Sequence, residues 1–160
     1  MSSTISGLLW KSSRDTMLKA EIGLLLPHGE SMCLLDAVDS WDDRTITCRT
    51  SSHRDHRNPL RAGGRLMITA GLEYAAQAMG VHVGLLNGGL RSGKQIGFVG
   101  SVRDVTFTIN RLDDLTQDLT VTATRLLEGD SSYIYRFSVT HDGSALIEGR
   151  ASIFIRAASS

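Results

Sequence analysis

The chain has 160 residues, 41% of them hydrophobic and 21% charged, which is the size and composition of one soluble globular domain. Its 17 Lys and Arg residues balance 17 Asp and Glu residues, so the formal net charge is +0. A nucleic-acid partner is not expected, because the chain has no excess of basic charge to meet a phosphate backbone.

The N-terminus is expected to be flexible over the serine-rich residues 1–14, and one domain is expected over 15–157. A basic start followed by a long apolar run is missing, so no signal peptide is predicted. A short helix is predicted over 15–26, with Asp15 at its start. Residues 27–31 contain the Pro and Gly of a turn.

Two strands are predicted next, over 32–41 and 44–51, with a pair of aspartates as the turn between them. Each strand holds one of the two cysteines, Cys33 and Cys48, among apolar or β-branched neighbours. We therefore expect buried free thiols, which are consistent with a reducing, cytoplasmic location.

A polar loop is predicted over 52–65, and it holds His53, Asp55 and His56 within four residues. An imidazole titrates near neutral pH, so either histidine is a candidate for proton transfer. The alternatives are a solvated polar loop and a metal site, but a metal would lack its third and fourth ligands.

The most apolar segment, residues 66–87, is predicted to be a helix that ends at an Asn-Gly-Gly stop signal. Its length suits a membrane span, but Glu73, Gln77 and His82 near its middle favour a buried core helix instead. His82 faces a different side of this helix from Glu73, so we interpret it as a core histidine.

Four strands rich in β-branched and aromatic residues follow the helix. They are predicted over 95–109, 117–128, 132–141 and 144–156. The connecting residues 88–94 have P-loop spacing, but Gln95 replaces the magnesium-binding Ser or Thr and a strand follows, so no phosphate loop is predicted. The order of elements indicates an α+β fold with a curved antiparallel sheet, because a helix that is apolar all round needs cover all round.

Glu73 is the only charged residue of the helical segment, and Gln77 follows one turn later on the same face. A buried carboxylate is costly unless it is paired, protonated or faces a cavity. Two interpretations stay open: a structural pairing with an arginine of the sheet, or a catalytic carboxylate at the wall of an acyl tunnel.

Several segments resemble, in the same order, the β-hydroxyacyl-[acyl carrier protein] dehydratases. Residues 24–41 hold a Leu-Pro-His turn and a Leu-Leu-Asp strand, and 72–86 look like the family's central helix with its Glu-Ala-x-Ala-Gln motif. Residues 97–107 and 145–155 are similar to its later strands. The Asn-Pro-Leu-Arg sequence at 58–61 resembles most closely the dehydratase-like branch of bacterial aryl-polyene clusters. The resemblance implies a hot-dog fold, with an antiparallel sheet wrapped around the long helix, assembled as a dimer.

The resemblance also implies the chemistry, which is loss of water from a (3R)-3-hydroxyacyl thioester to give the trans-2-enoyl product. A histidine takes the C2 proton and a carboxylate of the central helix protonates the leaving hydroxyl; in dimeric members the two come from different subunits. Glu73 matches the carboxylate. Gln77, Pro59 and Leu60 are expected to bind the substrate. No cofactor is expected, because the phosphopantetheine belongs to the acyl carrier protein.

The loop before the helix departs from the family, since its Gly-His-Phe-Pro run is absent and its histidine position falls near Pro59. His53 and His56 are both candidates for the base, and the His-Arg sequence favours His53. The predicted partners are acyl carrier protein, an acyl thioester and a second hot-dog subunit, as a homodimer or heterodimer. An acyl thioesterase and a non-catalytic acyl-binding or heterodimer subunit are the alternatives.

Overall fold

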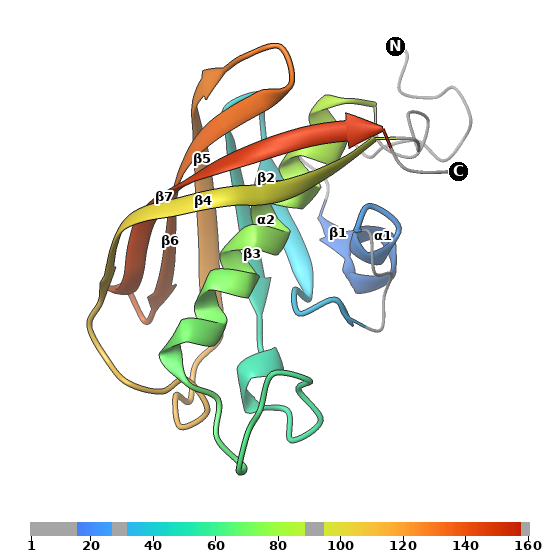
Figure 1. Ribbon diagram of the computed structural model, residues 1–160. Helices are drawn as coiled ribbons and strands as arrows, with labels where there is room; N and C mark the ends of the chain where they lie inside the picture. Colours follow the sequence, from blue (N-terminus) through green and yellow to red (C-terminus); the bar gives the residue numbers. More distant parts are fainter. Residues whose placement is uncertain (1–15, 27–31, 89–94, 158–160) are drawn as a thin grey trace.

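One antiparallel sheet of seven strands curves around helix α2 (Figure 1). The computed structural model describes residues 16–26, 32–88 and 95–157. The elements are β1 (Met17–Leu18), α1 (Lys19–Gly23), β2 (Ala37–Trp41), β3 (Thr45–Thr50), η3 (Ser52–Arg54), η4 (Ile68–Ala70), α2 (Gly71–Leu86), β4 (Gln95–Phe107), β5 (Leu119–Glu128), β6 (Ser132–His141) and β7 (Ser144–Ala157). The strand order is β1-β2-β3-β5-β6-β7-β4, so β1 and β4 are the edges of the sheet.

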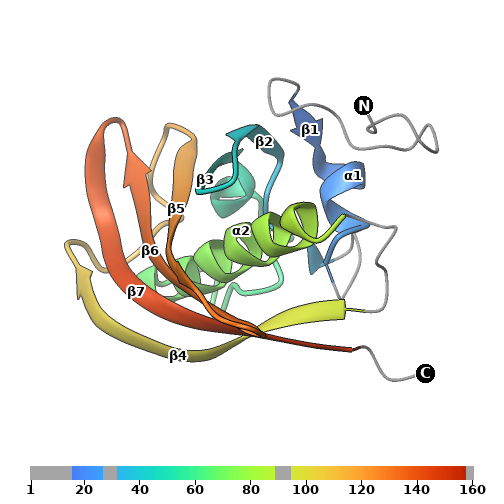
Figure 2. The ribbon, with the colours of Figure 1, turned by 90° about the horizontal axis from the view of Figure 1, so that it is seen from above.

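The predicted α+β arrangement is confirmed, because the strands pair antiparallel throughout and α2 lies in the concave side of their sheet (Figure 2). The four predicted C-terminal strands correspond to β4 to β7. Among the residues that the structure describes, no helix is long and apolar enough to cross a membrane. The predicted turn at 27–31 and the glycine-rich segment up to residue 94 lie outside the described residues, as do residues 1–15.

Two predicted helices are shorter in the structure. The N-terminal helix covers only Lys19–Gly23, since Met17 and Leu18 pair with β2 as strand β1. The long helix begins at Gly71 rather than at residue 66. The backbone N–H of Leu112 donates to the carbonyl of Leu66 over 2.7 Å, and this hydrogen bond holds the preceding residues against the chain before β5.

The first predicted strand is also shorter, because β2 begins at Ala37. Side chains bind the backbone of Leu34, which lies before the start of β2. Its N–H donates to Gln77 Oε1 over 2.8 Å, and its carbonyl accepts from Ser52 Oγ over 2.6 Å. The sequence pattern identified the apolar residues of this segment but not these side-chain partners.

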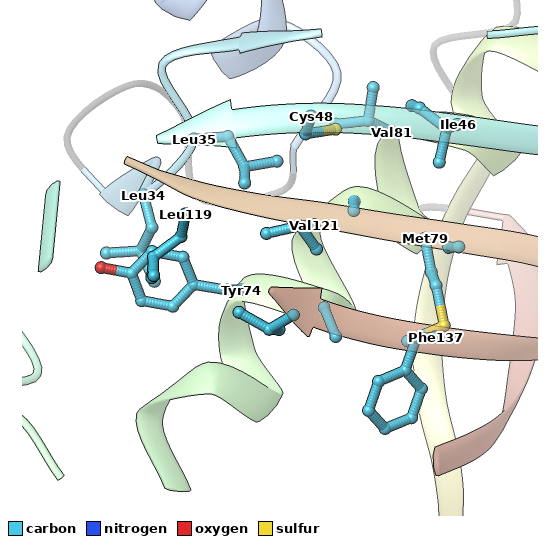
Figure 3. Close-up of a cluster of buried hydrophobic side chains, with 14 of the residues drawn as sticks. Leu34, Leu35, Ile46, Cys48, Tyr74, Met79, Val81, Leu119, Val121 and Phe137 are labelled. Carbon is cyan, nitrogen blue, oxygen red and sulfur yellow. The ribbon is translucent and has the colours of Figure 1, made fainter. Parts of the chain in front are cut away.

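The start of α2 packs closely on β7. A Cβ atom on Gly71 would collide with the Cδ1 atom of Ile147, so a larger residue fits at this helix position only if the Ile147 side chain moves. Farther along the helix, large side chains such as Tyr74 and Met79 enter the core beside Val121 and Phe137 of the sheet (Figure 3).

His82 is a core residue, as predicted. Its Nε2 lies 2.7 Å from the carbonyl of Asp42 and must donate there, so its Nδ1 accepts from the Tyr135 hydroxyl over 2.6 Å. Burial lowers the pKa of His82, which keeps the ring neutral at pH 7. Cys33 and Cys48 are both buried, as predicted.

Candidate functional site

Glu73 lies in the first turn of α2 and is exposed in the single chain. The expectation that its carboxylate is buried is therefore wrong for the chain by itself. No ion pair to Glu73 is found within residues 16–26, 32–88 and 95–157, so pairing with an arginine of the sheet is not observed. The carboxylate instead accepts a hydrogen bond from the neighbouring amide of Gln77.

Gln77 is buried and uses its amide in three directions. Its Nε2 donates to Glu73 Oε2 over 3.1 Å and to the carbonyl of Met32 over 2.9 Å. Its Oε1 accepts from the backbone N–H of Leu34 over 2.8 Å. Both amide hydrogens are thus engaged by protein atoms, and the amide ties Glu73 to the segment before β2. This arrangement suits a residue that orients the carboxylate.

A second group of polar side chains joins the loop before α2 to the helix. The hydroxyl of Tyr74 is 2.8 Å from Ser52 Oγ and accepts from Asn58 Nδ2 over 3.0 Å. Ser52 Oγ also donates to the carbonyl of Leu34 over 2.6 Å and accepts from Thr50 Oγ1 over 2.9 Å. The loop, the segment before β2 and α2 therefore meet at one hydrogen-bonded cluster beside Glu73.

Sequence reasoning missed Ser52, Asn58 and Tyr74. Tyr74 occupies the position of an alanine in the family motif, and that departure was the available signal. A large aromatic residue with a hydroxyl at a buried helix position needs a hydrogen-bond partner. The loop residue Asn58 supplies one, and its own side-chain oxygen accepts from the N–H of Leu60 over 2.9 Å.

His53 is completely buried in η3. Its Nε2 donates to the carbonyl of Leu115 over 3.2 Å, and its Nδ1 has no hydrogen-bond partner among the described residues. Burial is the main cause that lowers the pKa of His53. The charge of Arg54 lowers it further, and the carbonyls of Leu115 and Gln117 act in the opposite direction. The ring is neutral at pH 7, and in this conformation a substrate has no access to it.

The other predicted site residues lie in the loop 52–65, at the end of the molecule where α2 begins (Figure 1). His56 and Pro59 are exposed and Leu60 is half-buried. No hydrogen bond joins His53 or His56 to Glu73 in the part of the chain that the structure describes. The structure brings Glu73 and Gln77 together by a hydrogen bond. The catalytic roles of Glu73 and the two histidines, and the substrate-binding roles of Gln77, Pro59 and Leu60, stay predictions.

The loop is held in shape by Arg61. Its guanidinium donates to the backbone carbonyls of His53, Asp55 and Gly64 over 3.1, 2.9 and 2.9 Å. Three carbonyl acceptors in one loop fix the course of the chain ahead of the helix.

Within the described residues, no group of three His, Cys, Asp or Glu side chains is placed to hold a metal ion.

Comparison with protein families gives a match over most of the chain. The model of the ApeP-like family, described as ApeP dehydratase, matches residues 20–159. The chain belongs to the ApeP-like dehydratase family. No curated protein matches the sequence.

Solved structures similar to this member of the ApeP-like family share its fold, and the predicted hot-dog fold is confirmed. The dehydratase heterocomplex ApeI:P from Xenorhabdus doucetiae matches with a TM-score of 0.72 at 22% identity, covering 83% of this chain and 89% of that chain. The thioesterase HI1161 from Haemophilus influenzae matches with a TM-score of 0.64 at 10% identity, covering 94% and 98%. A hypothetical thioesterase from Streptococcus pneumoniae, solved with coenzyme A, matches with a TM-score of 0.55 at 14% identity, covering 77% and 87%.

Proposed function

We propose that the chain is a (3R)-3-hydroxyacyl-[acyl carrier protein] dehydratase subunit that forms the trans-2-enoyl thioester, with Glu73 as the general acid. The observation that carries the proposal is an exposed carboxylate in the first turn of α2, oriented by the buried amide of Gln77. Membership of the ApeP-like dehydratase family supports the class of reaction. No cofactor of the protein is needed, because the phosphopantetheine arm arrives with the substrate.

The elimination breaks the C2–H and C3–O bonds and forms the C2=C3 double bond. A base takes the C2 proton, and the carboxylic acid of Glu73 gives its proton to the departing hydroxyl, which leaves as water. Gln77 donates to Oε2, and this leaves Oε1 to carry the acid proton towards the substrate. An apolar acyl chain that excludes water from the site favours the neutral form of a carboxyl group.

The reaction also needs a base to take the C2 proton, and the single chain places no candidate base in hydrogen-bond contact with Glu73 among its described residues. His53 is buried and hydrogen-bonded to Leu115, and His56 is exposed with no hydrogen bond to the carboxylate among the described residues. We propose that a second hot-dog subunit supplies the base, and His56 is the alternative within the chain. The heterocomplex formed by the similar ApeI:P dehydratase supports an assembly of two different subunits.

Strand β4 offers a surface for that second subunit. It is an edge strand, and large hydrophobic residues on β4 and its neighbour β7 are exposed: Phe98, Val99, Val102, Phe107 and Phe154. An exposed, long and hydrophobic edge strand is a surface that proteins normally cover. Pairing along β4 is therefore our proposed mode of assembly.

The product of the reaction tests the proposal. The purified chain, alone and with a candidate partner subunit, is incubated with a 3-hydroxyacyl thioester of acyl carrier protein, and the thioester products are separated by mass. Loss of one water from the intact thioester is the expected result. An unchanged substrate in both samples contradicts the dehydratase assignment.

A thioesterase is the second candidate, because one of the similar structures is a thioesterase and another is a hypothetical thioesterase solved with coenzyme A. In that reaction Glu73 would orient a water molecule for attack on the thioester carbonyl. Release of a free thiol together with the 3-hydroxy acid, without enoyl formation, would identify this activity in the same experiment.

A further inference from the structure

The outer face of the sheet, turned away from α2, carries exposed hydrophobic side chains near the end of β7. Phe98 of β4 is opposite Phe154 of β7 in the register of the sheet, and their ring centroids are 6.2 Å apart. Phe98 is 41% exposed and Phe154 is 42% exposed. Ile153, the strand neighbour of Phe154, is buried in the core, so Phe154 projects from the opposite, outer face.

Two further apolar residues belong to the same face. Leu127 of β5 is opposite Ile134 of β6, and Ile134 is opposite Ser152, two residues before Phe154 on β7. Residues opposite each other, and residues two apart on a strand, share a face of the sheet. Leu127 is 63% exposed and Ile134 is half-buried. We call Phe98, Leu127, Ile134 and Phe154 the outer apolar group.

A row of three arginines borders the outer apolar group. Arg136 of β6 is opposite Arg150 of β7, and Arg150 is opposite Arg103 of β4. All three arginines are exposed. Arg150 comes four residues before Phe154 on the same strand, so the row runs about 13 Å from the two phenylalanines. The outer face is therefore apolar at one end and basic next to it.

The guanidinium groups of this row are not paired within the described part of the chain. No ion pair of the three arginines is found there, although Glu148 lies on the same face and Asp104 in the bulge of β4. Like charges directly opposite each other destabilise a sheet. An anionic surface that contacts the guanidinium groups would offset this cost.

The combination of an apolar group with an arginine row indicates the chemistry of the partner. A second copy of the same face would bring a second arginine row into the interface, where like charges repel. The helix α2 lies in the concave side of the sheet, so the outer face is convex (Figure 2). A lipid surface adapts to a convex face, and it offers phosphates to arginines and an apolar boundary to Phe and Leu side chains.

We propose that the outer face of the sheet binds the surface of a membrane that contains anionic phospholipid. In this arrangement the outer apolar group enters the boundary between headgroups and acyl chains. The arginine row contacts the lipid phosphates. The contact is interfacial, since it uses one face of a folded sheet and no membrane-spanning segment.

This surface is at the opposite end of α2 from the candidate site. Asn87, the residue after α2, donates to the Tyr133 hydroxyl over 3.4 Å, and Tyr133 is opposite Ile153, the neighbour of Phe154. Glu73 lies roughly 20 Å away along the helix. Pairing of a second subunit along β4 uses backbone groups at the edge of the sheet, so it leaves the outer face open. The proposed membrane contact does not depend on the proposed reaction.

Flotation of the full chain with vesicles tests the surface, with the chain alone and together with a partner subunit. Vesicles of phosphatidylcholine that contain phosphatidylglycerol are compared with vesicles of phosphatidylcholine alone. We expect binding at low salt to be about tenfold or more tighter with phosphatidylglycerol, and to weaken in high salt because salt screens exposed charges.

Two matched pairs of variants locate the contact. Leu127→Gln should weaken binding to the phosphatidylglycerol vesicles about tenfold, because its side chain no longer gains from leaving water. Leu24→Gln is the control with a loss below about twofold, since Leu24 is 58% exposed but follows α1 near the other edge of the sheet. Arg150→Gln should weaken binding about fivefold. Its control is Arg57→Gln, on a loop arginine whose side chain is 90% exposed.

Three results would overturn the proposal. The first is no binding of the wild type to phosphatidylglycerol vesicles. The second is an equal effect of Leu127→Gln and Leu24→Gln, or of Arg150→Gln and Arg57→Gln, because attraction by charge alone does not need this face. The third is self-association of the wild type without lipid that Leu127→Gln abolishes, which would identify a second copy as the partner. Enzymatic turnover is no part of the readout, so failure of the proposed dehydration leaves the lipid result standing.

Discussion

Gln77 donates a hydrogen bond to Oε2 of Glu73 over 3.1 Å, and the same amide binds the backbone at Met32 and Leu34. The carboxylate is thus held by a buried residue while remaining exposed itself. A residue held in this way keeps one orientation without losing access to a substrate, which is the requirement for a positioned general acid.

Replacing Gln77 by Leu should separate the effect of its amide on the orientation of Glu73 from its effect on the stability of the fold. The substitution leaves the N–H of Leu34 and the carbonyl of Met32 without their side-chain partner, so the free energy of unfolding should fall by about 1–3 kcal/mol. We expect kcat for dehydration to fall by about tenfold or more with a smaller change in KM. Unfolding by urea and steady-state kinetics measure the two effects. An unchanged kcat would show that the amide does not orient the acid.

Tyr74→Phe removes only the hydroxyl that joins α2 to Ser52 and Asn58. Because Asn58 Nδ2 and Ser52 Oγ each lose a partner, the free energy of unfolding should decrease by about 1–2 kcal/mol. Tyr133→Phe is a matched control, since the hydroxyl of Tyr133 accepts a long bond of 3.4 Å from Asn87 as its one hydrogen bond among the described residues. Equal losses in the two variants would contradict the importance of the cluster before α2.

The buried histidines predict how stability depends on pH. Burial lowers the pKa of both His53 and His82 in the folded state. In the unfolded chain a histidine titrates near pH 6.5, so below that pH the unfolded state binds more protons than the folded state. The free energy of unfolding should therefore be full above about pH 6.5 and should decrease as the pH falls towards 5.

Urea unfolding at several pH values between 5 and 7.5 measures this slope. His82→Gln should reduce it, because one of the two buried imidazoles is then missing. A stability that stays constant down to pH 5 would show that the two rings are not held neutral by burial.

Gly71→Ala should destabilise the protein through its contact with β7. The new methyl group would collide with Cδ1 of Ile147, and overpacking of this kind costs about 1–3 kcal/mol. Gly80→Ala on the same helix is the control: its Cβ would lie 3.8 Å from Leu26, and alanine is a better helix former by up to about 1 kcal/mol. Adding Ile147→Val, which lacks Cδ1, should restore part of the stability of Gly71→Ala. Thermal unfolding tests all three variants, and a harmless Gly71→Ala would contradict the close packing.

Much of the fold was predictable from the sequence, because the spacing of apolar residues along the chain indicates which side chains are buried and in which kind of element. The apolar stretch around Glu73 predicted the central helix, and the alternating residues after it predicted the strands from β4 to β7. The ends of elements were less predictable, since Leu34 and Leu66 are fixed by partners distant in sequence. The exposure of Glu73 could not be predicted either, because it depends on how neighbouring segments cover the first turn of α2.

The candidate site was predictable only in part. Glu73 and Gln77 share a helix face by spacing, and the structure joins them by a hydrogen bond. The positions of the two loop histidines relative to Glu73 could not be predicted in this way, because an irregular loop has no fixed spacing between side chains. His53 was favoured for catalysis from its neighbours in sequence, whereas its burial follows from the contact with Leu115, which lies in a different part of the chain.

The dehydration rate of Glu73→Gln is the most direct test of the central claim. The variant keeps the size of the side chain and its place beside Gln77 but cannot deliver a proton. With the partner subunit present and a 3-hydroxyacyl carrier-protein substrate, we predict a loss in kcat of about 100-fold or more, with substrate binding retained. A kcat equal to that of the wild type would contradict the assignment of Glu73 as the acid.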